Sequence, residues 1–417
     1  MIQIFLNPHK LKSFLITTLF SAFLFSFISC SPALRTGKKQ TNRYTSKSII
    51  KVFVDEFSEP RSISFTADVD LEISGKIVKL KKGTAVNLRI IEGEIRLRYG
   101  REESMTQFFS AEPLSGVLNF NGRDYSGELA FLTKNSKILV VNYLDVEEYL
   151  KGVLSAEMGI AANENDFEAL KAFAVCARNY SVMKMNENKK HFDIYPDTRD
   201  QVYRLTNYNT YIERAIKETS GLVLENGNDL AKIFYYSSCG GRTEDFRNVF
   251  SGIDQNHLQS IEDGQDHYCK ISPSYSWSER YSFQEIITHL RNANLITGDY
   301  NIFKSIDVKS RFRSGRINEL EIIVSNGNNP KSVTLKGNNI RSVIRARSRG
   351  LLRSTLCDIS TGNDEVIIEG RGYGHGVGLC QWGAIGQSRK GKKFREILYF
   401  YFPGTRLQNY NAMISGL

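Results

Sequence analysis

A glycine-rich stretch near the C-terminal end surrounds three side chains that could bind a ligand or take part in chemistry, His375, Gln381 and Trp382. Glycine stands at every second position from Gly370 to Gly378, and Gly383 follows the tryptophan. Glycine permits positive φ and close approach of the backbone to a ligand, which a regular helix or a packed strand does not require. We therefore interpret the stretch as a binding surface. The alternative is a glycine-rich turn whose histidine satisfies backbone groups.

Glu157 is a second candidate, because it stands where an amphipathic helix should carry an apolar residue. A helix is predicted to begin at Asp145, with a capping arrangement completed by Glu148, and to end at Gly159. At about 100° per residue, Glu157 falls on the apolar stripe of this helix. Burial against apolar groups should raise its pKa, as a general acid near neutrality requires. A structural salt bridge with Arg178, on a helix predicted from about 166 to 185, is an equal alternative.

Four blocks of sequence resemble the SpoIID/LytB family, in the order that the family has them. They are Tyr149–Met158, Glu168–Tyr180, Ser237–Glu244 and the glycine-rich stretch, and the resemblance runs from about Ile49 to the end of the chain. It implies action on the glycan strands of bacterial peptidoglycan. Glu157 matches the family's acid, which implies a lytic transglycosylase that cuts strands stripped of stem peptides and leaves 1,6-anhydromuramic acid ends.

The resemblance also implies a set of substrate-binding residues. Arg178 would orient the strand, through a muramic acid carboxylate. The other matched positions would line the cleft: Ser237, Gly240, Gly241, Thr243, His375 and Gln381. A glycoside hydrolase would more often need a second carboxylate. The next segment offers Glu164, Asp166 and Glu168, although these stand where capping and surface charges usually stand.

The chain departs from the family pattern at three places. Gly159 stands where proline often follows the acid block, and Cys380 stands where serine commonly precedes the glutamine. Some members carry a cysteine and histidine zinc cluster between the second and third blocks. Here His191 and Asp193 lie in that segment without a cysteine, so neither a metal nor another cofactor is predicted.

The first residues predict export. Lys10 and Lys12 precede an apolar run over 14–28, and a small residue precedes Cys30, as in a lipoprotein signal. We expect removal of residues 1–29 and lipidation at Cys30, with a plain signal peptide or an uncleaved anchor as the alternative. The protein would then be a membrane-anchored lipoprotein that faces the cell wall, with residues 30–48 as a basic tether.

An exporting compartment would let Cys239 and Cys269 form a disulfide, since both lie in predicted loops near the third block. Cys176 is interpreted as a core residue, because its helix is largely apolar. A cysteine peptidase that uses Cys239 or Cys380 with His375 as base is a less favoured alternative.

Length and pattern predict an α+β fold. The chain has 417 residues, 41% of them hydrophobic, enough for a sizeable core. Strand-like alternation fills 49–135, and the family-like core would span 136–417, with a second β-rich section at about 302–368. A last helix is predicted over Phe394–Tyr401, ended by proline and glycine.

A formal net charge of +10 suits a polyanionic partner, such as the cell wall or phospholipid headgroups. Nucleic acid is disfavoured, because the export signal separates the protein from it and no nucleic-acid module is recognisable. A non-catalytic protein that binds glycan and enhances a partner N-acetylmuramoyl-L-alanine amidase is the second function that the resemblance implies.

Overall fold

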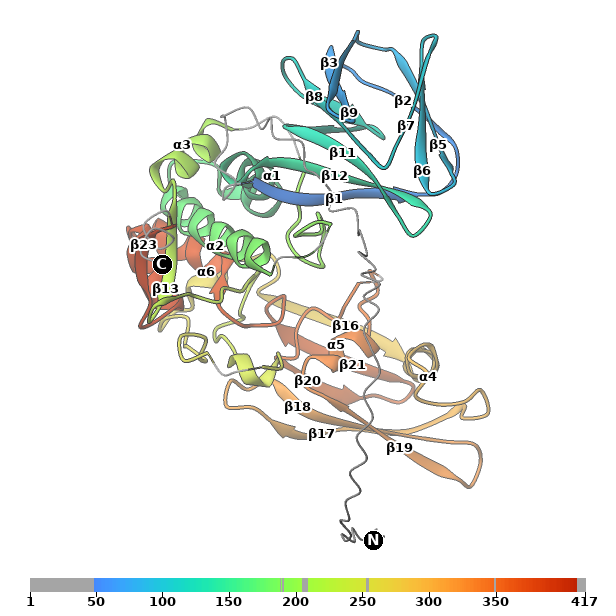
Figure 1. Cartoon of the computed structure of the whole chain (residues 1–417). Helices are drawn as coiled ribbons and strands as arrows, with labels where there is room; N and C mark the ends of the chain where they lie inside the picture. Colours follow the sequence, from blue (N-terminus) through green and yellow to red (C-terminus); the bar gives the residue numbers. More distant parts are fainter. Residues whose placement is uncertain are drawn as a thin grey trace, which may run out of the picture. The chain divides into compact units, whose positions relative to one another are not determined.

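The computed structural model describes residues 49–187, 189, 191–204, 209–252, 255–348 and 350–410. Its helices and strands confirm the predicted α+β class (Figure 1). Cys30, the predicted signal and the predicted tether lie outside the described residues. In the described part of the chain, no helix combines the length and apolar character needed to cross a membrane.

The N-terminal section consists of two antiparallel sheets and a hairpin (Figure 1). The first sheet has the order β1 (Ile49–Phe57), β12 (Lys137–Asp145), β11 (Glu128–Lys134), β8 (Phe108–Pro113), β3 (Val69–Ile73), β4 (Lys76–Leu80). The second has the order β2 (Arg61–Ser64), β5 (Ala85–Ile91), β6 (Glu94–Tyr99), β7 (Glu102–Thr106), and β9 (Leu118–Phe120) pairs with β10 (Arg123–Tyr125). Alternate residues such as Val86 and Leu88 are buried, as the strand pattern predicts.

β12 leads directly into the helical layer. The helices are α1 (Val146–Met158), α2 (Phe167–Asn186), α3 (Thr210–Glu218), α6 (Gln381–Arg389) and α7 (Phe394–Tyr401). α1 begins as predicted, because the Asp145 carboxylate accepts from the backbone N–H of Glu147 at 2.8 Å; Glu148 forms an ion pair with Lys151. Gly159 ends α1 and starts a 3-10 turn, Gly159–Ala161. α2 packs against α1, α3, α6 and α7.

Two short strand pairings join distant segments around these helices. β13 (Leu222–Asn226) lies between β14 (Asp229–Leu230) and β23 (Arg406–Asn409). β15 (Tyr235–Tyr236) pairs in parallel with β22 (Leu379–Cys380), so the third family-like block lies beside the glycine-rich stretch. The end of that stretch is therefore a strand and the start of helix α6, where the sequence pattern had indicated neither.

The second β-rich section is larger than predicted. One sheet has the order β16 (Ser276–Ser282), β21 (Glu365–Arg371), β20 (Cys357–Thr361), and the other β17 (Ile302–Arg311), β18 (Ile317–Ser325), β19 (Pro330–Lys336). α4 (Phe283–Asn292) and α5 (Asn339–Val343) accompany them, and the section has its own hydrophobic core. The predicted start near 302 was wrong because β16 and α4, which begins with a Ser282–Glu285 capping box, precede it.

Candidate functional site

Glu157 lies in the last turn of α1, half-buried and held by two hydrogen bonds. The backbone N–H of Val202 donates to Oε1 at 3.0 Å, and Nε2 of Gln381 donates to Oε2 at 3.4 Å. Burial raises the pKa of Glu157, and the hydrogen bonds from Val202 and Gln381 oppose that rise. The direction agrees with the sequence-based expectation for a general acid.

Gln381 reaches Glu157 because the β15–β22 pairing fixes the start of α6. The side chain of Gln381 is only 9% exposed, so its amide has a defined position. The structure thus brings together two of the predicted site residues, one from the helical block and one from the glycine-rich block.

Two tyrosines that the sequence analysis missed, Tyr149 and Tyr235, lie near enough to Glu157 for its charge to act on them, and Tyr149 also contacts Gln201. The hydroxyl groups of Tyr149 and Ser181 donate to Oε1 of Gln201, at 3.4 and 3.0 Å. Burial raises the pKa of Tyr149 and Tyr235, and the negative charge of Glu157 adds to both shifts. No sequence signal marks Val202, because it acts through its backbone N–H.

Arg178 pairs with Glu147 and not with Glu157, so the alternative of a Glu157–Arg178 salt bridge was wrong. Its guanidinium makes a two-point contact with Glu147, at 2.8 and 2.7 Å, and donates to Leu222 O at 3.0 Å. Glu147 lies in the first turn of α1, about 15 Å along the helix axis from Glu157. Because Arg178 is 1% exposed and fully engaged with protein groups, its surroundings favour a structural role over strand binding.

The third block also serves the protein interior. Thr243 is 1% exposed; its Oγ1 accepts from the N–H of Ile261 at 2.7 Å, so the expected contact of Thr243 with a sugar is not what its geometry favours. The N–H of Gly241 donates to Cys239 Sγ at 3.4 Å, and Gly240, with φ +71°, packs against the Arg371 backbone. Ser237 accepts the N–H of Trp382 through its carbonyl, at 3.0 Å.

His375 is held as a neutral ring by the backbone. Nδ1 accepts from the N–H of Val377, and Nε2 donates to Tyr235 O, each at 3.1 Å. Burial, with a contribution from the charge of Arg341, lowers the pKa of His375 to about 3. Since both ring nitrogens are engaged, the cysteine peptidase alternative lacks its base, and the two backbone contacts of His375 support the glycine-rich stretch.

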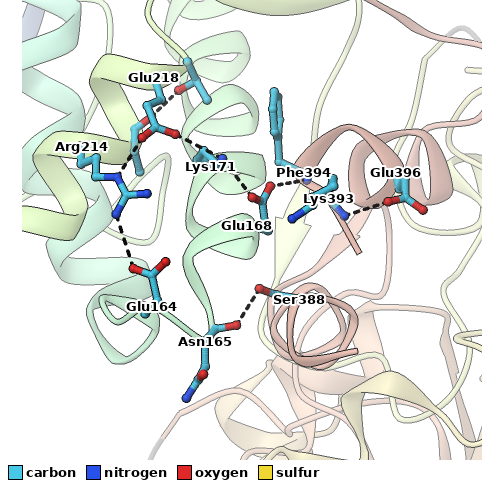
Figure 2. A network of polar contacts seen from close by, with 12 residues as sticks. Glu164, Asn165, Glu168, Lys171, Arg214, Glu218, Ser388, Lys393, Phe394 and Glu396 are labelled. Carbon is cyan, nitrogen blue, oxygen red and sulfur yellow. Dashed lines mark hydrogen bonds and ion pairs between the residues drawn. The ribbon is translucent and has the colours of Figure 1, made fainter. Parts of the chain in front are cut away.

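The three carboxylates considered for a hydrolase are bonded elsewhere, and Figure 2 shows the contacts of Glu164 and Glu168. Asp166 is fully buried against Arg389, at 2.7 and 2.9 Å. Glu164 pairs with Arg214, and Glu168 pairs with Lys171 and accepts from the N–H of Phe394. Glu164 and Glu168 line a hollow of about 800 Å³ whose lining includes neither Asp166 nor Glu157. Glu164 is exposed and Glu168 lies in the first turn of α2, as expected, but Asp166 is buried and its side chain does not cap the helix, so the expected capping or surface role was wrong for Asp166.

Three thiols and a carboxylate meet beside Gln381. The ligand atoms of Cys239, Asp263, Cys269 and Cys380 all lie within 4.8 Å of one another, and all four residues are buried. The Sγ atoms of Cys239 and Cys269 are 3.3 Å apart, longer than the about 2.05 Å of a disulfide, and all three cysteines are free thiols. The predicted disulfide is therefore not formed.

This set fits a metal, since thiolates and a carboxylate at such spacing are ligands that zinc prefers. The prediction of no metal was drawn from the segment around His191, and the candidate ligands lie elsewhere. Asp263 and Cys269 flank the start of a 3-10 turn, Tyr268–Ile271, which no family-like block covers.

One segment of the chain matches the model of the SpoIID family. Residues 134–225, which carry Glu157, match the family model described as stage II sporulation protein. Residues 241–378, which include the second β-rich section, match a domain of unknown function, DUF8618.

Similar proteins extend this assignment. An amidase enhancer of Bacillus subtilis is 26% identical over 84% of this chain, which spans 54% of that protein, about half its length. Stage II sporulation protein D of Bacillus subtilis is 26% identical over 66% of this chain and 78% of its own. An uncharacterized protein of Brachyspira hyodysenteriae is 28% identical over 89% of this chain and 95% of its own.

Proposed function

We propose that this protein is a peptidoglycan lytic transglycosylase in which Glu157 is the general acid and then the general base. The observation that carries the proposal is the position of Glu157, half-buried between the Val202 N–H and the Gln381 amide, with its pKa raised by burial. A carboxyl group of that kind is protonated at higher pH than usual, and so can donate a proton to a leaving oxygen.

One carboxyl group is sufficient for this reaction. The Glu157 proton goes to the glycosidic oxygen as the bond to the muramic acid C1 breaks. The resulting carboxylate then takes the proton of the C6 hydroxyl of the same muramic acid as that oxygen bonds to C1, which closes the 1,6-anhydro ring. The enzyme returns to its starting protonation and no water is consumed, so the second carboxylate of a hydrolase is not required.

The two hydrogen bonds to Glu157 suit its two protonation states. Oε1 accepts from a backbone N–H, which can only donate a hydrogen bond and so could not accept one from a protonated Oε1; the proton therefore belongs on Oε2. Gln381 faces Oε2 and carries both an NH₂ donor and a carbonyl acceptor. Rotation of its amide lets it donate to the carboxylate or accept from the carboxylic acid, and thereby follow the proton through the cycle.

A second candidate function is enhancement of a partner amidase by glycan binding without cleavage. The observation that favours it is the similarity to the amidase enhancer over 84% of this chain. Either function fits the formal charge of +10, since peptidoglycan carries carboxylates. We also propose that the protein is exported and anchored through Cys30, which places it beside this substrate.

The test is incubation of the full chain and of Glu157→Gln with intact and with amidase-stripped peptidoglycan, followed by mass spectrometry of the fragments. A transglycosylase gives new 1,6-anhydromuramic ends that are lost in the variant. If neither protein cleaves, but both bind glycan and both accelerate an added amidase, the enhancer function replaces the proposal.

A further inference from the structure

Buried thiols and a buried carboxylate from separate segments converge next to the candidate site. Cys239 follows β15 and Cys380 ends β22. Asp263 lies in the loop that leads into the 3-10 turn Tyr268–Ile271, and Cys269 lies within that turn. Each of the four is 0% exposed. We propose that Cys239, Asp263, Cys269 and Cys380 bind one Zn²⁺ ion as a structural site.

The spacing fits tetrahedral coordination. With Zn–S distances of about 2.3 Å, the sulfurs of such a site lie about 3.8 Å apart. Here the Cys239 and Cys269 sulfurs are 3.3 Å apart, and no pair of ligand atoms exceeds 4.8 Å, so small side-chain rotations bring all four to one ion. Four protein ligands fill the coordination sphere, which is the arrangement of a structural rather than a catalytic zinc.

Backbone N–H groups already point at the sulfurs. Cys380 Sγ accepts from the N–H of Cys239 and of Gly383, each at 3.2 Å, and Cys239 Sγ accepts from the N–H of Gly241 at 3.4 Å. Cys380 is also the N-cap of α6, where the helix favours negative charge. Such donors stabilise the thiolate, which is the form that binds a metal, and fix the orientation of the ligand.

The carboxylate of Asp263 lacks a basic partner among the described contacts. It accepts from the Tyr401 hydroxyl at 2.6 Å and from the N–H of Cys269 at 2.8 Å. A fully buried carboxylate normally pairs with a cation or coordinates a metal. A disulfide between any two of the thiols would use neither the third thiol nor the Asp263 carboxylate, which would still lack a cation. A Zn²⁺ ion would bind all four groups.

Such a site would fix Gln381, the residue after Cys380, by tying β22 to Cys239 and to the loop that carries Asp263. It would therefore help to position the amide that contacts Glu157. Zinc content is measured independently of cleavage, so the metal site and the proposed reaction can fail separately.

The test is elemental analysis of the full chain, purified without chelator, together with zinc X-ray absorption. We expect a zinc-to-chain ratio near one and a first shell of three sulfurs and one oxygen. Cys380→Ser, Cys269→Ser and Asp263→Asn should each reduce the affinity for added Zn²⁺ more than tenfold. Cys176→Ser and Cys357→Ser, which change buried cysteines outside the cluster, should keep wild-type zinc content.

Asp263→Asn is nearly isosteric and keeps the size of the side chain. If the cysteine variants fail to fold, the zinc affinity of Asp263→Asn still tests the site. On the wild-type chain, chelation should lower the melting temperature and Zn²⁺ alone should restore it. A folded chain that binds no added Zn²⁺, or peptide mapping that finds Cys239 and Cys269 joined as a disulfide, would overturn the proposal.

Discussion

At the residue scale, the acid role proposed for Glu157 depends on how its neighbours set its pKa. Burial raises that pKa and the hydrogen bond from Gln381 lowers it. Gln381→Leu should therefore raise the pKa further. A general acid works only while protonated, so cleavage falls as pH rises through this pKa, and the fall should move to higher pH in the variant.

The measurement is kcat/KM for glycan cleavage as a function of pH, with Gln408→Leu, at an exposed glutamine, as the control. A high-pH limb that stays in place, or moves to lower pH, in Gln381→Leu would contradict the contact between the amide and the acid. Absolute activity should also fall, since the amide helps to hold Oε2.

Glu157 should also leave a signature in the pH dependence of stability. Its folded pKa is raised, so the folded state binds the proton more tightly than the unfolded state. Between the unfolded and the folded pKa, the free energy of unfolding therefore decreases as pH rises. Glu157→Gln removes this contribution and should match the wild type below the unfolded pKa but exceed its stability above it. Urea unfolding across pH measures the difference; a variant less stable at every pH would refute this account.

At the element scale, the α1–α2 contact depends on the Glu147–Arg178 pair. Removal of the carboxylate alone leaves a buried cation without its counterion, so Glu147→Gln should cost about 3 kcal/mol. The double variant Glu147→Gln with Arg178→Met removes both charges and should recover most of that loss. Urea unfolding gives both values.

The same double variant separates a structural Arg178 from a strand-binding one. A structural Arg178 predicts that KM for glycan stays near the wild-type value once the chain is folded. A large rise in KM with restored stability would instead assign Arg178 to the substrate.

Two helical glycines should respond in opposite ways to alanine. Gly159 ends α1 with φ −55° and open space around it, so Gly159→Ala should stabilise by about 0.4–1 kcal/mol. Gly383 lies inside α6, where an added Cβ would collide with the Tyr401 hydroxyl and come within 2.7 Å of Asp263 Oδ1. Gly383→Ala should cost about 1–3 kcal/mol or more. Thermal unfolding of the two variants is the check, and a neutral Gly383→Ala would contradict the close packing.

At the scale of the whole molecule, the sequence predicted the helices whose start and stop signals lie within the helix itself, and it did not predict features that depend on contacts between distant segments. α1 and α7 were predictable because a cap, an apolar period and a proline–glycine stop lie in the sequence itself. α6 was missed because glycine, a poor helix former, stands at Gly383 and Gly386. A Cβ at Gly383 would meet Tyr401 and Asp263, and a Cβ at Gly386 would meet the Tyr268 backbone, so neither position has room for a side chain.

The residues of the candidate site likewise fall into those that the sequence indicates and those that only the folded structure reveals. Glu157 was indicated by helical periodicity, and Gln381 by its motif. The Val202 N–H carries no side-chain signal, and the meeting of Asp263 with the thiols depends on how distant loops pack. The resemblance of Arg178 to a family arginine suggested a ligand role, whereas its partner Glu147 became evident only from the packing of α1 on α2.

The proposed anchor is testable on the intact cell. Lipidation at Cys30 would hold the mature chain at the membrane through its acyl chains. Cys30→Ser should therefore lose incorporation of a labelled fatty acid and leave the membrane fraction, whereas Cys176→Ser should do neither. An unlabelled wild-type chain would refute the lipoprotein proposal without affecting the proposed chemistry.

The source of the oxygen atom at the new chain end distinguishes a transglycosylase from a hydrolase. Purified glycan strands are digested in water enriched in the heavy oxygen isotope, by the full chain and by Glu157→Gln, and the new ends are analysed by mass spectrometry. We expect 1,6-anhydromuramic ends that contain no heavy oxygen, formed at least about a hundredfold more slowly by the variant. Reducing ends that carry the heavy isotope, or anhydro ends formed at an unchanged rate by Glu157→Gln, would contradict this expectation.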